Sequence, residues 1–204
     1  METSNVFFSD ADFQVYPTSY LYLTSSTDGK EWSAPQLLNA DVKEADESFY
    51  GVGPGRGLVT SDGIIMFSCY TYAGQNGQRS SIIYSGDGEN WYRTNDVPDN
   101  LGWSSESQLV ELYDHTIRCF FRNSWGTICY ADYDGASWSE SVSTGISVES
   151  NCQISAITYS ETINGKQAIL LLRLRPFQRQ DLRDAGGRRQ EHEGAVCVRC
   201  YHRW

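Results

Sequence analysis

A short pattern, x-x-Asp-Gly-x-x-Trp, occurs three times in this chain and constrains its fold more than any other feature. The three copies contain these aspartates and tryptophans: Asp28, Asp87 and Asp134, and Trp32, Trp91 and Trp138. An Asp-Gly pair favours a tight turn, because glycine tolerates positive φ and the aspartate side chain accepts nearby backbone N–H groups. The tryptophan four positions on can fold back beneath the turn, so we expect all three indoles to be buried.

The spacing of the copies predicts the architecture. Successive aspartates lie 59 and then 47 residues apart, and each copy follows a strand-like run of apolar residues. Repeats of this length, with several strands in each, are typical of β-propeller blades. Aromatic residues make up 13% of the chain, and 18 glycines outnumber 5 prolines, which favours strands and turns. We therefore predict an all-β fold in which residues 1–172 form about three to four four-stranded antiparallel blades.

The charge and hydropathy pattern excludes some functions. The net charge of −10 makes the chain a poor electrostatic partner for nucleic acid or an anionic membrane. No apolar run is long enough to span a membrane, so we expect no membrane segment. The first five residues show no basic region followed by an apolar stretch, so no signal peptide is visible.

Residues 173–204 differ from the rest and are predicted to be a separate tail. They hold half of the 16 basic residues, all of them arginine, and they lack the alternation that continues a sheet. Three interpretations remain: a basic interaction arm, a small metal site at Cys197, Cys200 and His202, or a non-native tail translated out of frame. We favour the third and expect no bound metal. The other four cysteines are expected to be free, buried thiols.

A hairpin in the middle of the chain brings two charged residues together. Residues 106–112 and 116–123 alternate like two strands, joined by a turn at residues 113–115. A hairpin brings its outer ends together, so Glu106 is predicted to lie beside Arg122. An ordinary cross-strand ion pair at the surface is the alternative interpretation of these two residues.

The three repeats resemble the Asp-box of the sialidase superfamily, Ser-x-Asp-x-Gly-x-Thr-Trp. They differ from it, because the residue between Asp and Gly is missing in each copy and Asp132 replaces the serine of the third. Other segments resemble large bacterial exo-α-sialidases: Glu-Ser-Gln-Leu-Val-Glu-Leu at 106–112, Phe-Phe-Arg-Asn at 120–123, Tyr-Gly-Val-Gly-Pro-Gly-Arg-Gly at 50–57, and the runs at 152–157 and 164–169. The resemblance covers residues 5–171.

The resemblance implies a partial six-bladed propeller and a sialic-acid site. It assigns Glu106 as the base that deprotonates a tyrosine nucleophile, and Arg122 as one of three arginines that hold the sugar carboxylate. Tyr70, Gln78 and Phe49 are candidates for contacts with the sugar, with core or rim packing as the alternative for each. It implies no cofactor, sialylated glycans as partners, and a secreted or cell-surface location.

The resemblance also implies that the site is incomplete in this chain. The family's other two arginines, its aspartic acid and its tyrosine nucleophile match no residue here. We therefore expect an exo-α-sialidase by family, with a chain that is an incomplete and inactive fragment. A trans-sialidase of the same family and a non-catalytic carbohydrate-binding propeller are the alternatives.

Overall fold

The computed structural model describes residues 19–72, 77–148, 153–173 and 199–201 of the chain. Strands dominate these residues, and the one helix among them is the single turn α1 (Asn39–Val42). The strands are β1 (Tyr22–Leu23), β2 (Gln36–Leu37), β3 (Phe49–Val52), β4 (Leu58–Val59), β5 (Ile65–Tyr72), β6 (Gln78–Ser85), β7 (Tyr92–Arg93), β8 (Ser104–Glu111), β9 (Ile117–Asn123), β10 (Thr127–Tyr133), β11 (Val142–Ser147), β12 (Ile154–Ile163), β13 (Lys166–Arg173) and β14 (Arg199–Tyr201).

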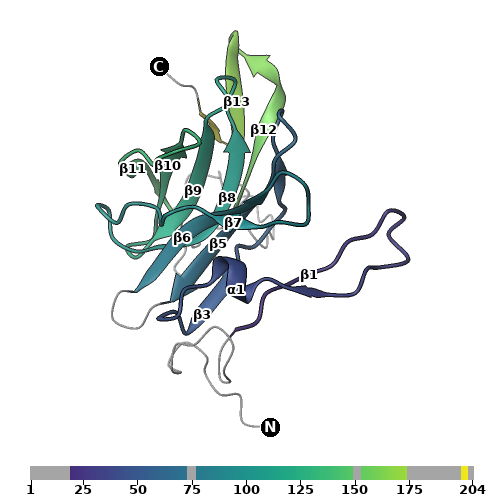
Figure 1. Cartoon of the computed structure of the whole chain (residues 1–204). Coiled ribbons are helices and arrows are strands. Elements are labelled where there is room, and N and C mark those ends of the chain that lie inside the picture. The colour runs from purple at the N-terminus through teal and green to yellow at the C-terminus, as the bar shows by residue number, and fades with distance from the viewer. Residues whose placement is uncertain (1–18, 73–76, 149–152, 174–198, 202–204) are drawn as a thin grey trace, which may run out of the picture.

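The strands form antiparallel sheets that follow the chain in order (Figure 1). The first large sheet has the order β3-β5-β6-β7, with β4 beside β5, and the next is the meander β8-β9-β10-β11. A third sheet contains β12, β13 and β14, and β1 pairs with β2 in a small hairpin. The predicted all-β class with four-stranded antiparallel sheets is thus confirmed. No helix in the described part of the chain has the length and apolar character to cross a membrane.

The β8–β11 sheet is buried on both faces, which fixes its position and register. Side chains of a strand alternate between the two faces. Leu109 and Phe121 join a hydrophobic cluster with residues of β5 and β6, whereas Val110 and Phe120 join a second cluster with residues of β12 and β13. A slip of one residue would exchange the two sets, so the double burial strongly specifies how β8 pairs with β9.

The Asp-Gly turns form as predicted, and the second copy illustrates their chemistry. The Asp87 Oδ1 atom accepts the backbone N–H groups of Asn90 at 2.8 Å and Glu89 at 2.9 Å, while Ser85 Oγ accepts the N–H of Gly88 at 2.8 Å. These bonds, that from the Asn90 N–H above all, hold the pKa of Asp87 well below its ordinary value. Equivalent bonds surround Asp28 and Asp134, so all three aspartates stabilise turns.

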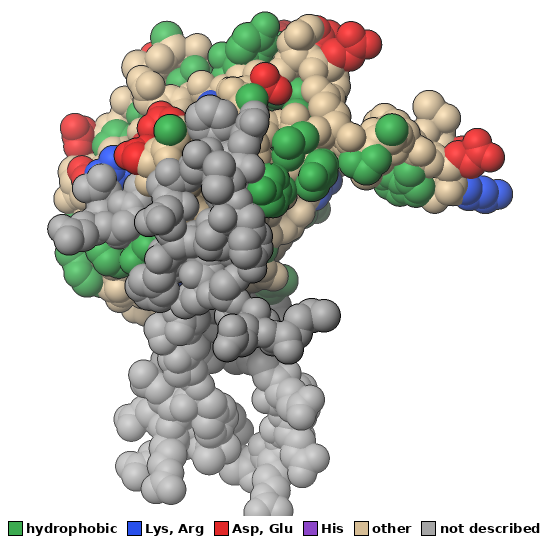
Figure 2. Space-filling view, turned by 60° about the horizontal axis from the view of Figure 1, so that its bottom comes forward, with side chains coloured by type: hydrophobic (Ala, Val, Ile, Leu, Met, Phe, Trp, Pro, Cys, Tyr) green, Lys and Arg blue, Asp and Glu red, His purple; other side chains and the backbone are tan. Residues whose placement is uncertain are grey.

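The expected burial of the three repeat tryptophans is wrong for one of them. Trp91 is buried, and Trp138 is partly buried against the ring of Tyr133. Trp32 is 61% exposed. The reason is that Trp32 lies on the β1–β2 hairpin, which projects from the body as an arm (Figures 1 and 2). Burial of an indole needs a second layer, and within the described residues no sheet stacks on this arm.

The tail prediction also needs a correction. Residues 199–201 form β14 and pair with β13, from Ile169↔Tyr201 to Leu171↔Arg199. Arg173, the last residue of β13, also pairs with Ile154, so the expectation that nothing after residue 172 continues a sheet is wrong for these four residues. Cys197 and His202 of the metal interpretation, and Cys152, lie outside the described residues. Cys69, Cys119 and Cys129 are free and buried, as expected. The domain boundary at residue 172 stays a prediction.

Candidate active site

The hairpin predicted around residues 106–123 forms, and a bulge at its open end presents Glu106. β8 pairs with β9 from Glu111↔Ile117 outward, but the register shifts between Ser104 and Ser107. Ser104 lies opposite Asn123 and Ser107 lies opposite Phe121, so Ser105 and Glu106 together face the single residue Arg122. Two residues against one is a β-bulge, a feature that redirects a side chain without breaking the sheet.

Glu106 and Arg122, hereafter the candidate pair, are close in space. Arg122 Nε lies 3.5 Å from Glu106 Oε2, and the two side chains are 13% and 24% exposed. Arg122 Nη2 also lies 3.4 Å from Ser105 Oγ, on the other residue of the bulge. The geometry is that of a partly buried ion pair and not of a fully solvated surface pair.

The contact within the candidate pair is an ion pair and not a hydrogen bond. Arg122 Nε and Glu106 Oε2 are both buried, and they face each other at 3.5 Å without meeting hydrogen-bond geometry. Buried polar groups are nearly always hydrogen-bonded, so a loose contact of this kind costs free energy. The guanidinium is therefore held in place by charge, without a hydrogen bond to Glu106.

The side chains of Tyr70 and Phe49 leave the same face of the neighbouring sheet, and Tyr70 lies near the candidate pair. Burial raises the pKa of the Tyr70 hydroxyl, the Glu106 carboxylate raises it further, and the Arg122 guanidinium opposes both. Tyr70 is therefore a neutral phenol at physiological pH. Its ring packs on Phe49, with ring centroids 5.2 Å apart. Glu106, Arg122, Tyr70 and Phe49 thus form one cluster drawn from β3, β5, β8 and β9.

Gln78 occupies the first position of β6, at the edge of this cluster. It lies opposite Tyr72, which is two residues along β5 from Tyr70. Residues opposite each other in antiparallel strands share a face, so the Gln78 and Tyr70 side chains leave the sheet on the same side. Gln78 therefore lies on the face of the sheet that carries Tyr70, but no described contact joins it to the candidate pair.

Serine side chains that sequence reasoning missed fix the backbone around Glu106. Ser80 Oγ donates to the carbonyl of Ser105, and Ser68 Oγ donates to the carbonyl of Ser107 at 2.7 Å. The carbonyls on either side of Glu106 are therefore both held by hydroxyls from β5 and β6. The one sequence signal was the presence of serines, which favour turns and caps, inside otherwise apolar strand patterns.

Replacing Ser80 with alanine tests this backbone support. Ser80→Ala leaves the buried carbonyl of Ser105 without its hydroxyl donor, so we expect the free energy of unfolding to fall by about 1–3 kcal/mol. Urea unfolding followed by fluorescence measures the change. Ser155→Ala, at an exposed position of β12, is the matched control. Equal stability of the two variants would contradict the supporting role.

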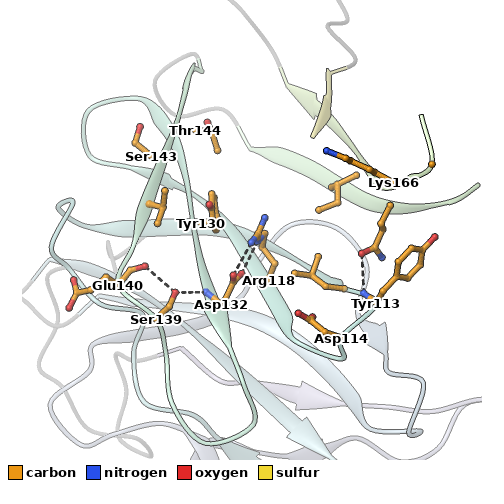
Figure 3. Close-up of a pocket in the computed structure, with 15 residues that line it drawn as sticks. Tyr113, Asp114, Arg118, Tyr130, Asp132, Ser139, Glu140, Ser143, Thr144 and Lys166 are labelled. Atoms are coloured by element: carbon orange, nitrogen blue, oxygen red, sulfur yellow. Dashed lines mark hydrogen bonds and ion pairs between the residues drawn. The ribbon is translucent and has the colours of Figure 1, made fainter. Parts of the chain in front are cut away.

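A cavity of about 980 Å³ lies elsewhere. Tyr113, Arg118, Tyr130 and Asp132 are among the residues that line it (Figure 3). Arg118 already donates to both carboxylate oxygens of Asp132, at 2.7 and 2.8 Å, and its guanidinium lies 3.9 Å from the centre of the Tyr130 ring. This arginine is satisfied by the protein itself. Neither this cavity nor a second one of about 340 Å³ is lined by the candidate pair.

Comparison with protein families identifies the repeat. The model of a family described as "BNR repeat-like domain" matches residues 5–190. That range includes all three Asp-Gly turns and the candidate pair.

Comparison with individual proteins gives similar results. The chain is 35% identical over 173 residues to sialidase B of Streptococcus pneumoniae and 34% identical over 181 residues to the anhydrosialidase of Macrobdella decora, with 82% of the chain covered in each case. It spans 24% and 23% of these two relatives, or about a quarter of their length. The solved structure of a Hadza microbial sialidase superposes with a TM-score of 0.73 at 25% identity, covering 84% of this chain and 35% of that one.

Proposed function

The chain belongs to the BNR-repeat sialidase family, and on this basis we propose that the candidate pair is part of the sialic-acid site of an exo-α-sialidase. In this proposal the enzyme releases terminal α-linked sialic acid from glycoconjugates, with retention of configuration. Arg122 binds the carboxylate of the sugar, and Glu106 is the catalytic base.

One observation carries the proposal: a guanidinium and a carboxylate lie 3.5 Å apart and partly buried, in an ion pair that is not a hydrogen bond. A guanidinium fork matches the two oxygens of a carboxylate, so Arg122 suits an anionic sugar. The ion pair with Glu106 restrains Arg122 but leaves the other guanidinium nitrogens for the ligand.

The chemistry of the family explains why a carboxylate accompanies this arginine. Sialidases use a tyrosine nucleophile in place of the second carboxylate of most glycosidases. Sialic acid carries its own carboxylate next to the reacting carbon, and a neutral phenol approaches that anion without charge repulsion. Glu106 would take the phenol proton as the oxygen attacks. Tyr70, neutral and half-buried, together with Gln78 and Phe49 would contact the uncharged parts of the sugar.

Intramolecular transfer is a second candidate reaction. One relative at 34% identity is named an anhydrosialidase, which indicates that this family includes enzymes with an anhydro product. Hydrolysis and intramolecular transfer share the residues proposed here and differ in what attacks the anomeric carbon in the second step. Water attacks it in hydrolysis, and a hydroxyl of the sialic acid itself attacks it in intramolecular transfer. Product analysis by mass spectrometry separates them, because the anhydro sugar is one water lighter than sialic acid. A propeller that only binds carbohydrate would give neither product.

The proposed substrate implies partners and a place of action. Sialylated glycoproteins, glycolipids and oligosaccharides are the proposed partners, and secretion or surface display would bring the protein to them. The net charge of −10 argues against nucleic acid as a ligand.

Removal of the Arg122 charge tests the proposed role directly. Arg122→Ala is expected to weaken the binding of an α-methyl sialoside by about 10–100-fold, because one charge-assisted contact contributes about 1.5–3 kcal/mol. Titration followed by NMR chemical shifts suits the weak affinity expected of a single arginine.

Two further variants make this result specific. Arg56→Ala removes the same charge from an exposed position and should bind like the parent. Glu106→Gln should keep binding, since the guanidinium remains. Equal weakening by Arg56→Ala and Arg122→Ala would mean that net charge, not this site, controls binding.

A further inference from the structure

The bulge in β8 leaves Glu106 without the regular support of a sheet. Ser105 and Glu106 together face Arg122, so the ladder between β8 and β9 is interrupted at this point. The ion pair of Glu106 with Arg122 is not a hydrogen bond, so it fixes the carboxylate only loosely. The position of Glu106 therefore depends on how firmly the next residues of β8 are held.

The side chain of Gln108, two residues after Glu106, joins β8 to a loop of the neighbouring sheet. Gln108 is 2% exposed. Its Nε2 donates to the carbonyl of Pro54, in the loop of residues 53–57 between β3 and β4, and to the carbonyl of Ser107 at 3.1 Å. One amide group thus connects the residue after Glu106 with a segment 54 positions away in the chain.

Two glycines of this loop bring its backbone into direct contact with β8. A Cβ added at Gly55 would collide with the side-chain amide of Gln108, and one added at Gly53 would lie 2.8 Å from the carbonyl oxygen of Ser107. Gly55 also has a φ of 117°, so a larger residue is disfavoured there on two counts. The loop is therefore packed on the two residues that follow Glu106, with no side chain of its own between.

The order of contacts along β8 places this loop between the candidate pair and a cavity. Residues 105 and 106 form the bulge, and the loop covers residues 107 and 108. Residues 109–112 line the cavity of about 340 Å³, together with Arg56 of the loop and Leu58 of β4. If the loop moved away from β8, this cavity would extend toward the bulge, and the backbone next to Glu106 would lose its packing.

We propose that Gln108 is a positioning residue for Glu106. Its amide clamps the loop of residues 53–57 onto β8, and this clamp fixes the direction in which the bulge presents the carboxylate. A catalytic base must lie within hydrogen-bond reach of the proton that it accepts, so a small displacement of the carboxylate matters. This inference rests on the proposed function, because it takes Glu106 as the base, and Gln108 itself contacts no substrate.

Gln108→Glu in the 204-residue chain tests the clamp with almost no change of shape. The introduced carboxylate has no proton to donate to the Pro54 carbonyl, whereas its protonated form has one. Burial beside carbonyl oxygens raises the pKa of such a carboxyl, so lowering the pH from about 8 to about 5 restores the donor. The NMR signal of the Arg122 Nε–H group, which faces Glu106, should be displaced at the higher pH and return toward the parent position at the lower one. The parent is measured at each pH, which gives the change that comes from all other groups.

Two further variants show whether the effect belongs to the clamp. Gln108→Met keeps the length of the side chain but never donates, so the Arg122 signal should be displaced at both pH values. Leu38→Ala removes a buried side chain from a different cluster, with Val42 and Trp91, and should lower the midpoint of urea unfolding. Its Arg122 signal should match that of the parent, because a loss of stability alone does not move Glu106.

The outcomes separate this inference from the proposed function. An Arg122 signal that stays at the parent position in both Gln108 variants, with lowered urea midpoints, would show that Gln108 only stabilises the fold and would overturn the inference. A displacement or a loss of fold in Gln108→Glu that does not reverse at the lower pH would also overturn it. Because no ligand enters this test, either result leaves the sialic-acid site as proposed. Absence of α-methyl sialoside binding to the parent would overturn the proposed function, and with it the base that Gln108 is proposed to position.

Discussion

The 204-residue chain is expected to release the fluorophore of a sialoside at least about 10³-fold more slowly than sialidase B of Streptococcus pneumoniae, a relative at 35% identity. The reason is that, in the proposed site, Glu106 and Arg122 are only two members of a set of residues that acts as a unit. Glu106 can accept a proton, but no tyrosine of this chain matches the nucleophile of the family. Arg122 would provide only one of the three arginines that the resemblance implies.

The assay compares the two proteins at equal concentration with one fluorogenic sialoside. Glu106→Gln and Arg122→Ala should not lower the residual rate further, because that rate does not depend on an assembled site. Turnover within about tenfold of the relative, lost in both variants, would contradict this expectation. It would mean that the chain carries a nucleophile that the resemblance does not reveal.

The largest expected effect on stability comes from the centre of the β8–β11 sheet. Phe121 is fully buried, within the cluster shared with β5 and β6. Phe121→Ala removes this contact and leaves a cavity, so the free energy of unfolding should fall by about 3–5 kcal/mol. Because Phe121 lies beside Arg122 on β9, the same variant should also disorder the candidate pair.

Urea unfolding measures this change, and Tyr113→Ala is the control. Tyr113 lies in the β8–β9 turn and is 61% exposed, so its removal should alter stability by no more than about 0.5 kcal/mol. Similar midpoints for the two variants would show that the sheet is not packed on both faces as described.

The sequence predicted what depends on local pattern. The β8–β9 hairpin follows from alternating residues on both sides of a polar turn, and its antiparallel pairing alone brings residue 106 near residue 122. The Asp-Gly turns follow from bonds within four residues, as around Asp87. The proposal that the candidate pair is more than an ordinary ion pair comes from the resemblance and not from the local pattern.

What depends on contacts between distant segments was not predictable in this way. Trp32 has the same local pattern as Trp91, yet its burial depends on a second layer that the pattern does not specify. The hydroxyl bonds of Ser68 and Ser80 to the backbone around Glu106 join residues 39 and 25 positions apart in the chain. The pairing of β14 with β13 joins segments about 30 residues apart, in a region without strand periodicity.

The central claim is that Arg122 binds the carboxylate of sialic acid, and the Nε–H group of that side chain reports on it most directly. This group is buried and faces Glu106 Oε2 at 3.5 Å, so its proton senses any change in how the guanidinium is held when the neighbouring nitrogens bind a carboxylate. Its NMR signal, assigned through the Arg122→Lys variant, should shift on titration with α-methyl sialoside and should not shift with the methyl ester, which lacks the charge. The paired guanidinium of Arg118 should be unaffected by either ligand. Equal shifts of the Arg122 signal with acid and ester, or a shift confined to Arg118, would contradict the claim.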